Sequence, residues 1–445
     1  MFATVDIQRR IHPSWPVILF GLFAFWTYEI AFFVLLRPAI TEGGEPRASD
    51  PIARAANIAV LAGLILLAAR QRFFLSYLVR HARLPALILL YCLCSALWSL
   101  DPATSARRTI SLATCFGFGY LALVTYGPRG TIRIYAWSLF LAAIASWLAL
   151  PLFHGKVYDN DAAISAAIVR TFHGVFTQKN ELSVEMLMGV CCWLYLGFVD
   201  PRQAEPERRL WPIALAVILA AMVYSKGTTS LLAAALVALA AIRLRWRSWR
   251  LALLLYAGLA ATALVLATTL IVDPELLLAA LGKDTSMTGR LPLWIESAHA
   301  VATRPVLGWG YNVFWSPDSI WARYIWQRIG WPAPNAHNGL LQLGLDFGLV
   351  GGALYLLMML RLAARTLIAL ADPGFPESKY LALLLIAMTI ENIDEGTIGS
   401  PDALSILTAF WYAMTSVWRA GTWPVPLTAA LAPQRPMSEP AWLPE

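Results

Sequence analysis

The chain is dominated by a series of long apolar runs, separated by short segments that carry most of its charge. A helix needs roughly 20 apolar residues to cross a bilayer core of about 30 Å. Because 59% of the residues are hydrophobic and only 14% are charged, a soluble globule of this length is excluded. We therefore predict an all-α polytopic membrane protein with about twelve transmembrane helices, at 15–36, 52–69, 84–100, 109–126, 132–153, 181–199, 210–224, 228–242, 251–272, 337–360, 380–395 and 403–418.

Arginine is concentrated in alternate connections between these runs. Connections retained in the cytoplasm are enriched in Lys and Arg, which predicts an inner side for the basic segments near 70–83, 129–133, 202–209, 243–250 and 361–379. Both termini are then cytoplasmic, and the outer connections are 38–51, 101–108, 154–180, 225–227, 273–336 and 396–402. The net charge of +7 follows from this topology and from attraction to anionic headgroups, so we do not predict nucleic-acid binding.

The predicted layout has five parts. They are a cytoplasmic N-terminus without a cleavable signal (1–14), nine spans (15–272), one large outer loop containing short helices (273–336), three spans (337–418) and a Pro-rich cytoplasmic tail expected to be disordered (419–445). Irregular backbone is poorly tolerated in lipid. The large loop, which gathers arginines and many aromatic residues, is therefore the first place to look for function at the membrane boundary.

Two residues in or beside this loop are the candidate catalytic groups. Arg290 precedes Pro292, which fits the first turn of a short helix running to about Thr303. Its guanidinium could hold a phosphate through paired N–H donors, or it could meet lipid headgroups. His337 is predicted in the first turn of the next span, where the helix dipole disfavours imidazolium and a neutral ring could act as a general base. A helix-capping or interfacial His is the alternative.

Further polar residues fall in other outer connections. Lys226 occupies a tight turn, and the end of loop 154–180 carries Arg170, Lys179 and Asn180. These groups could extend a phosphate-binding surface, or they could be a snorkelling Lys and an ordinary solvated connector.

The large loop also contains eight aromatic residues between Trp309 and Trp331, among them Tyr311. Their rings could stack on sugars or sit at the membrane interface. Four carboxyl groups fall inside predicted spans, where charge is costly, and they motivate a transporter hypothesis: Glu29, Glu185, Asp346 and Glu391. The histidines of the outer connections and the five cysteines lack metal-ligand spacing, so we predict neither a metal site nor a cofactor.

An ordered set of short motifs resembles the O-antigen ligase and Wzy-type polymerase superfamily, over roughly residues 85 to 400. The set comprises Gly174-x-Phe176 with Lys179-Asn180, Ser225-Lys226-Gly227, Thr288-Gly289-Arg290 with Trp294, Pro305, Gly308-Trp309-Gly310 and His337-Asn338. Trp98-Ser99-x-Asp101-Pro102 with Arg107-Arg108 is similar to the exopolysaccharide polymerase branch. Each motif is weak alone, whereas their order within a polytopic layout is more specific.

The resemblance implies a metal-independent, inverting glycosyltransferase in the bacterial inner membrane. It implies polymerisation of undecaprenyl-diphosphate-linked repeat units into exopolysaccharide on the periplasmic face, with one lipid-linked oligosaccharide as donor and another as acceptor. The family's essential His falls on His337 as base and its loop Arg on Arg290 as diphosphate clamp, while a second family Arg is Lys226 here. Predicted substrate-binding residues are Lys226, Arg170, Lys179, Asn180, Asn338, Tyr311 and Trp309.

Two alternatives remain open from the sequence. An O-antigen ligase would transfer a lipid-linked glycan to lipid A core, and no residue separates it from a polymerase. A flippase or ion-coupled transporter would use the carboxyl groups in the spans. Membrane lipid is an expected partner and a chain-length regulator a candidate one, while the sugars, the linkage, the acceptor and the oligomeric state are not fixed by the sequence.

Overall fold

The computed structural model describes residues 13–29, 31–36, 51–71, 74–160, 170–200, 206–246, 290–396 and 398–421. The predicted ninth span (251–272), most of the terminal segments and residues 273–289 of the large loop lie outside this part of the chain. The described residues are mainly helical, with one antiparallel pair of short strands, β1 (Tyr158–Asn160) and β2 (Arg170–Phe172).

Helices occupy every predicted span that falls within the described residues. They are α1 (Trp15–Tyr28), α2 (Phe33–Leu36), α3 (Pro51–Arg70), α4 (Phe74–His81), α5 (Arg83–Cys94), α6 (Pro102–Leu152), α7 (Lys179–Leu194), α8 (Glu207–Ser225), α9 (Thr228–Arg245), α12 (Arg290–Thr303), α13 (Ile320–Ile329), α14 (Gly339–Ala369), α15 (Ser378–Asp394) and α16 (Ala403–Ala420). Short turns η2 (Ser95–Leu97), η3 (His154–Lys156) and η4 (Tyr195–Val199) join them. Of these, α3, α6, α7 with η4, α8, α9 and α14 are long and apolar enough to cross a membrane.

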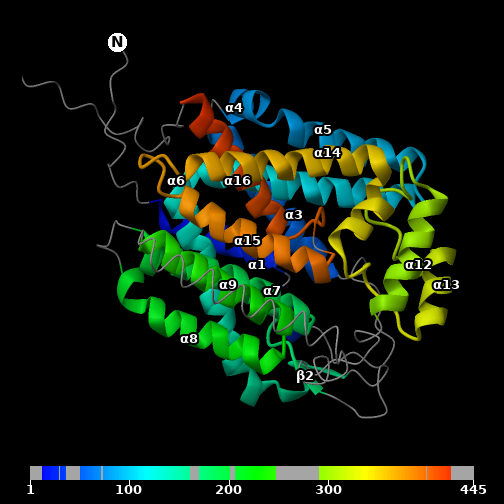
Figure 1. Ribbon diagram of the computed structural model, residues 1–445, viewed down its shortest axis with the longest axis horizontal. Helices are drawn as coiled ribbons and strands as arrows, with labels where there is room; N and C mark the ends of the chain where they lie inside the picture. Colours follow the sequence, from blue (N-terminus) through cyan, green and yellow to red (C-terminus); the bar gives the residue numbers. More distant parts are fainter. Residues whose placement is uncertain are drawn as a thin grey trace, which may run out of the picture.

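The longest helix, α6, lies at the centre of the bundle and packs most extensively against α16, with α1 and α7 also against it. Its 51 residues include a break at Gly127, followed by Pro128, so it corresponds to the two separate spans predicted at 109–126 and 132–153. Large aromatic side chains such as Tyr135, Trp193 and Trp411 are fully buried between these helices. The long axes of most helices run in a similar direction (Figure 1).

Connections predicted on the outer side contact the outer ends of spans that lead into other outer connections. The amide of Leu100 donates to the carbonyl of Trp309 over 3.2 Å. The Ser225 hydroxyl, in the 225–227 turn, lies 2.7 Å from that of Ser183 near the start of α7. Arg290 pairs with Glu395, which directly follows α15. These contacts bring the predicted outer connections to one end of the helices.

Connections predicted on the inner side likewise contact one another. Arg129, beside the break in α6, pairs with Asp200, which follows η4. Arg133 Nε lies 2.9 Å from Glu207 Oε1 at the start of α8. Two of the arginines that mark the predicted cytoplasmic side therefore have buried carboxylate partners in the next inner connection.

The described part of the large loop forms a small helical unit at one end of the bundle, where α12 and α13 lie side by side (Figure 1). A second apolar cluster holds it together through Leu293 of α12, Ile325 of α13 and Trp309 and Phe314 between them. Leu345 of α14 belongs to the same cluster. The predicted short helix ending at Thr303 is confirmed as α12.

This unit is attached to a break in α14 at Gly348 (φ 59°). A Cβ on Gly348 would lie 2.5 Å from the backbone nitrogen of Gly308, and one on Gly308 would lie 2.7 Å from that of Gly348. The amide of Leu349 donates to Pro305 O over 2.8 Å and that of Trp309 to Leu345 O over 2.7 Å. Segment 305–309 therefore satisfies backbone groups that the break in the helix would leave unpaired.

The Trp98-Ser99-x-Asp101-Pro102 motif supports the same segment. Trp98 Nε1 donates to Leu307 O over 3.2 Å. A Cβ on Gly310 would lie 2.6 Å from Ser99 Oγ. Asp101 caps α6 by accepting from the Thr104 amide over 3.0 Å, and hydrogen bonds from the Thr104 side chain and amide lower its pKa. The motif has a structural function in seating the large loop on the bundle.

Candidate functional site

The carboxylate of Glu395 joins three predicted site residues from different parts of the chain. Its Oε2 lies 2.9 Å from His337 Nδ1, and its Oε1 accepts from Arg290 Nη2 over 2.9 Å and from Asn180 Nδ2 over 2.7 Å. Glu395 directly follows α15, Arg290 begins α12, Asn180 lies in the first turn of α7, and His337 precedes α14. The structure thus brings together the two candidate catalytic residues. We call these four residues the Glu395 cluster.

His337 is held in an unusual backbone conformation just outside its helix. Its φ is +44°, in the left-handed region that residues with a Cβ seldom adopt. The amide donates to Asn335 Oδ1 over 2.7 Å and the carbonyl accepts from Trp294 Nε1 over 3.0 Å. His337 is buried, with 5% of the residue exposed, and the centroid of its ring lies 5.6 Å from that of Trp331. These contacts fix the direction of the ring.

The prediction that His337 lies in the first helical turn is wrong. α14 begins at Gly339, and Asn338 is its N-cap, accepting from the amides of Leu340 and Leu341, each over 3.1 Å. An Asn side chain satisfies these unpaired amides, so the helix starts after it. Asn338 Nδ2 also donates to Ile393 O over 3.1 Å, which ties the start of α14 to the end of α15 beside Glu395.

Arg290 is the first residue of α12, with its side chain 14% exposed. A cation at a helix N-terminus is opposed by the helix dipole. Glu395 supplies the compensating negative charge at 2.9 Å. The helix N-terminus and the guanidinium thus hold one anionic group, the Glu395 carboxylate, in a position of the kind that also suits a phosphate.

Lys226 lies in a turn that packs against the start of α7. It is exposed, has a left-handed φ of +59° and ends α8. The next residue, Gly227, approaches α7 so closely that a Cβ there would lie 2.0 Å from Ser183 Oγ. Ser183 is one helical turn beyond Asn180, so Lys226 is placed on the α7 side of the Glu395 cluster. Lys179, the first residue of α7, lies on the same turn as Asn180.

Two other predicted residues, Trp309 and Tyr311, are not brought into the cluster. A third, Arg170, is in β2, where its backbone pairs with Asn160. Trp309 is buried, with Nε1 donating to Ala300 O over 3.0 Å and the guanidinium of Arg304 over its ring. Tyr311 is fully buried, and its hydroxyl donates to Gly399 O over 2.8 Å. Burial from water raises the pKa of Tyr311. In the structure both aromatic residues stabilise the loop.

The carboxyl groups predicted inside spans are buried, and Glu29 and Glu185 lie close enough to interact electrostatically. Glu185 Oε2 accepts from Tyr135 OH over 2.7 Å, and Glu29 Oε1 accepts from Ser138 Oγ over 2.8 Å. Asp346 Oδ2 accepts from Gln342 Nε2 over 2.8 Å. Among the described residues, no three His, Cys, Asp or Glu side chains are grouped so that they could hold a metal ion.

The pairing of His337 with Glu395 determines what the imidazole can do. A carboxylate at Nδ1 favours the tautomer that carries its proton there and leaves Nε2 as the acceptor. It also stabilises the imidazolium that forms when Nε2 takes a proton. The Glu395 cluster therefore places an imidazole whose Nε2 can accept a proton beside the positive charge of Arg290.

The fold and this cluster define a multi-pass α-helical membrane protein with a polar site at one end of its bundle. Residues 212–356 match the family model described as O-Antigen ligase, and this region contains Lys226, Arg290 and His337. The chain is also 29% identical over 376 residues to the exopolysaccharide production protein ExoQ of Rhizobium meliloti (strain 1021), across 76% of this chain and 80% of that protein. Both findings confirm the resemblance indicated by the motifs.

Proposed function

We propose that this protein is a glycosyltransferase that polymerises undecaprenyl-diphosphate-linked oligosaccharide repeat units into exopolysaccharide. The observation that carries the proposal is the shared carboxylate of Glu395, which holds His337 and Arg290 at 2.9 Å each. A base and a cation held on one carboxylate can act on the same substrate. Similarity to an exopolysaccharide production protein over most of the chain supports exopolysaccharide as the product.

In this mechanism His337 Nε2 accepts the proton of an acceptor hydroxyl as its oxygen attacks the anomeric carbon of the donor. The bond between that carbon and the diphosphate oxygen breaks, and the lipid diphosphate leaves with the bonding electrons. Direct displacement inverts the anomeric configuration. Glu395 stabilises the imidazolium, and the diphosphate is a good leaving group once cations neutralise its charge, so no general acid is required.

The donor diphosphate is assigned to the cationic side of the cluster. Arg290 carries five N–H donors in a planar fork, so a contact with Glu395 through Nη2 is compatible with binding a second anion. Lys226 contributes charge from the adjacent turn and Lys179 from the start of α7, where the neutral amide of Asn180 offers polar atoms only. Arg170 and Asn338 are further candidate contacts, since Arg170 lies in a connection predicted on the outer side and Asn338 closely follows another.

The proposed location is the bacterial inner membrane, with the Glu395 cluster facing the periplasm and both termini in the cytoplasm. Two observations support this location. Arginine is concentrated in alternate connections, and the segments predicted on each side of the membrane contact other segments of the same side. Activated sugars are carried across this membrane on lipid diphosphate, and nucleotide sugars are absent outside it. A site built from cations without an acidic metal-binding motif suits that donor.

A ligase is the second candidate, because the matched family model is described as O-Antigen ligase. A ligase would use the same donor and the same cluster and would differ only in transferring the glycan to lipid A core. The two reactions are separated by their products. Purified protein given two differently labelled lipid-linked repeat units yields dimers and longer chains if it is a polymerase, and no such products if it is a ligase.

The same assay tests the catalytic assignment against transport. We expect His337→Ala to abolish product formation, because it removes the base. Glu185→Gln, which alters a buried carboxyl that hydrogen-bonds to Tyr135 rather than to the Glu395 cluster, is the matched control and should retain activity. Product formation by His337→Ala at the wild-type rate, with loss in Glu185→Gln, would reject the transferase and favour the transporter.

A further inference from the structure

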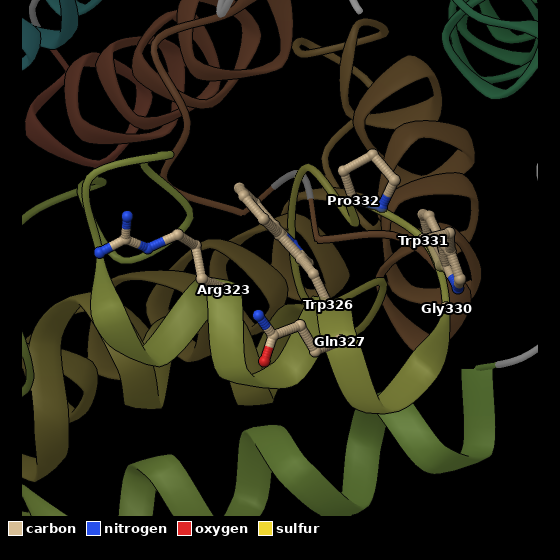
Figure 2. Close-up of a pocket in the computed structure, with 6 residues that line it drawn as sticks. All are labelled: Arg323, Trp326, Gln327, Gly330, Trp331 and Pro332. Atoms are coloured by element: carbon tan, nitrogen blue, oxygen red, sulfur yellow. The ribbon is translucent and has the colours of Figure 1, made fainter.

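A pocket of about 390 Å³ lies beside the Glu395 cluster, in the helical unit of the large loop. It is lined by Arg323, Trp326, Gln327, Gly330, Trp331 and Pro332. Figure 2 shows the Trp326 ring between Arg323 on one side and Pro332 and Trp331 on the other. The proposed mechanism gives none of these residues a function.

The pocket is built by the way α13 ends. Gly330 takes the left-handed conformation (φ 82°), and its amide donates to Trp326 O over 2.8 Å. This stops the helix and turns Trp331 and Pro332 back toward Trp326. Trp326 Nε1 donates to Ala333 O over 2.9 Å, which fixes the plane of its ring. The aromatic surface is therefore held in place by the backbone of its own loop.

The pocket reaches the site through Trp331, whose ring centroid lies 5.6 Å from that of His337. Its lining contains no residue of the Glu395 cluster and none of the proposed diphosphate-binding cations. Around Glu395, Arg290 and Asn180 contact Oε1, whereas His337 contacts Oε2. The pocket thus adjoins the base rather than the side assigned to the leaving group.

We propose that this pocket binds the terminal sugar of the acceptor glycan and directs its hydroxyl to His337 Nε2. This inference rests on the proposed transferase function and assigns its acceptor subsite. Half-buried Trp326 and Trp331 offer apolar ring faces, while exposed Arg323 and Gln327 offer planar hydrogen-bonding groups. A pyranose presents matching surfaces, with C–H groups on its faces and hydroxyls around its edge. A few polar groups around an apolar floor are typical of small-ligand sites.

The test uses the lipid-linked oligosaccharide that accumulates in cells from which the gene has been deleted. Mild acid releases its oligosaccharide from the lipid diphosphate, and a fluorescent tag is placed at the reducing end. This tagged glycan can act only as an acceptor, because it has no leaving group. Its KM is measured with purified protein at a fixed concentration of lipid-linked donor.

We expect Trp326→Ala to raise the acceptor KM by about tenfold or more, with the donor KM unchanged, since a buried aromatic contact at a binding hot spot has about this effect. Gln327→Ala should raise it by a smaller factor. Tyr324→Ala is the matched control, because it removes an aromatic side chain from α13 that is 44% exposed and does not line the pocket. It should leave the acceptor KM unchanged.

Binding of the tagged glycan to the His337→Ala protein, followed by fluorescence anisotropy, separates this inference from the proposed function. Binding that is lost in Trp326→Ala supports the subsite even where wild-type protein transfers no sugar. Normal transfer with an unchanged acceptor KM in Trp326→Ala overturns the subsite and leaves the transferase intact. Equal losses of activity in Trp326→Ala and Tyr324→Ala, without a change in acceptor KM, would make α13 a lipid-interface anchor instead.

Discussion

Substitution of Glu395 by Gln tests the centre of the proposed site, because it keeps the shape of the side chain and removes its charge. The carboxylate accepts from Arg290 and Asn180 at Oε1 and faces His337 Nδ1 at Oε2. A Gln amide has one oxygen and one NH₂ group. If its oxygen accepts from Arg290 and Asn180, its NH₂ group must face His337 Nδ1. In the reversed orientation the NH₂ group would face the N–H donors of Arg290 and Asn180.

The expected magnitude follows from the first orientation. An NH₂ group at Nδ1 requires that nitrogen to accept, which moves the imidazole proton to Nε2 and removes the base. General base catalysis contributes about 10²–10⁴-fold to rate, so kcat should fall by about that factor. The change also leaves Arg290, only 14% exposed, without its carboxylate. Breaking such a pair costs about 3–5 kcal/mol, so folding must be checked separately.

The assay compares single-turnover rates of wild type, Glu395→Gln, His337→Ala and the double variant, each first shown to be monodisperse and to have a measurable melting temperature. If Glu395 acts through His337, the double variant should be no slower than His337→Ala. A kcat for Glu395→Gln within about threefold of wild type, in protein of native stability, would refute the reasoning. If the fold-reductions in rate of the two single variants multiply in the double variant, Glu395 acts independently of the imidazole.

Two further predictions concern the cation and the turn beside it. Arg290→Lys keeps the charge but loses the planar pair of N–H donors. Because a hydrogen bond to a charged group contributes about 1.5–3 kcal/mol, kcat/KM for the donor should fall about 10–100-fold. A fall as large as that in Arg290→Ala would argue against a specific function for the paired donors. Gly227→Ala would place a Cβ 2.0 Å from Ser183 Oγ, so it should cost about 1–3 kcal/mol and lower the melting temperature, whereas Gly155→Ala, with open space around it, should not. Equal melting temperatures for these two variants would contradict the close packing of the turn on α7.

Apolar run length predicted most of the fold. The predicted spans within the described residues are mostly helical, because a run long enough to cross a bilayer has few alternatives to helix. The first span is the exception, since it is divided between α1 and α2. The short helix from Arg290 to Thr303 was also predictable, since Pro292 suits a first turn and apolar residues recur at helical spacing. The break at Gly127 was visible only as a gap between two predicted spans.

The site was predicted less completely, for reasons of chain topology. Arg290 and His337 could be chosen by residue type and position, but Glu395 lies 105 and 58 residues from them along the chain. No local sequence pattern shows that the carboxylate of an acidic residue after a helix contacts residues of a distant loop. Asn338 decides where α14 begins, and its capping bonds place His337 outside the helix. The buried hydroxyl of Tyr311 donates to the carbonyl of Gly399. Because Gly399 is distant along the chain, this pairing could not be predicted from one sequence.

The contact between Gly308 and Gly348 links the large loop to the imidazole of His337. Each backbone occupies the volume that a side chain on the other would need, so a larger residue at either position must push the two segments apart. The short first part of α14, from Gly339 to the break, carries that displacement directly to the residue before its N-cap, which is His337. Natural or engineered variants at these two distant glycines should therefore alter turnover while leaving every substrate-contacting side chain unchanged.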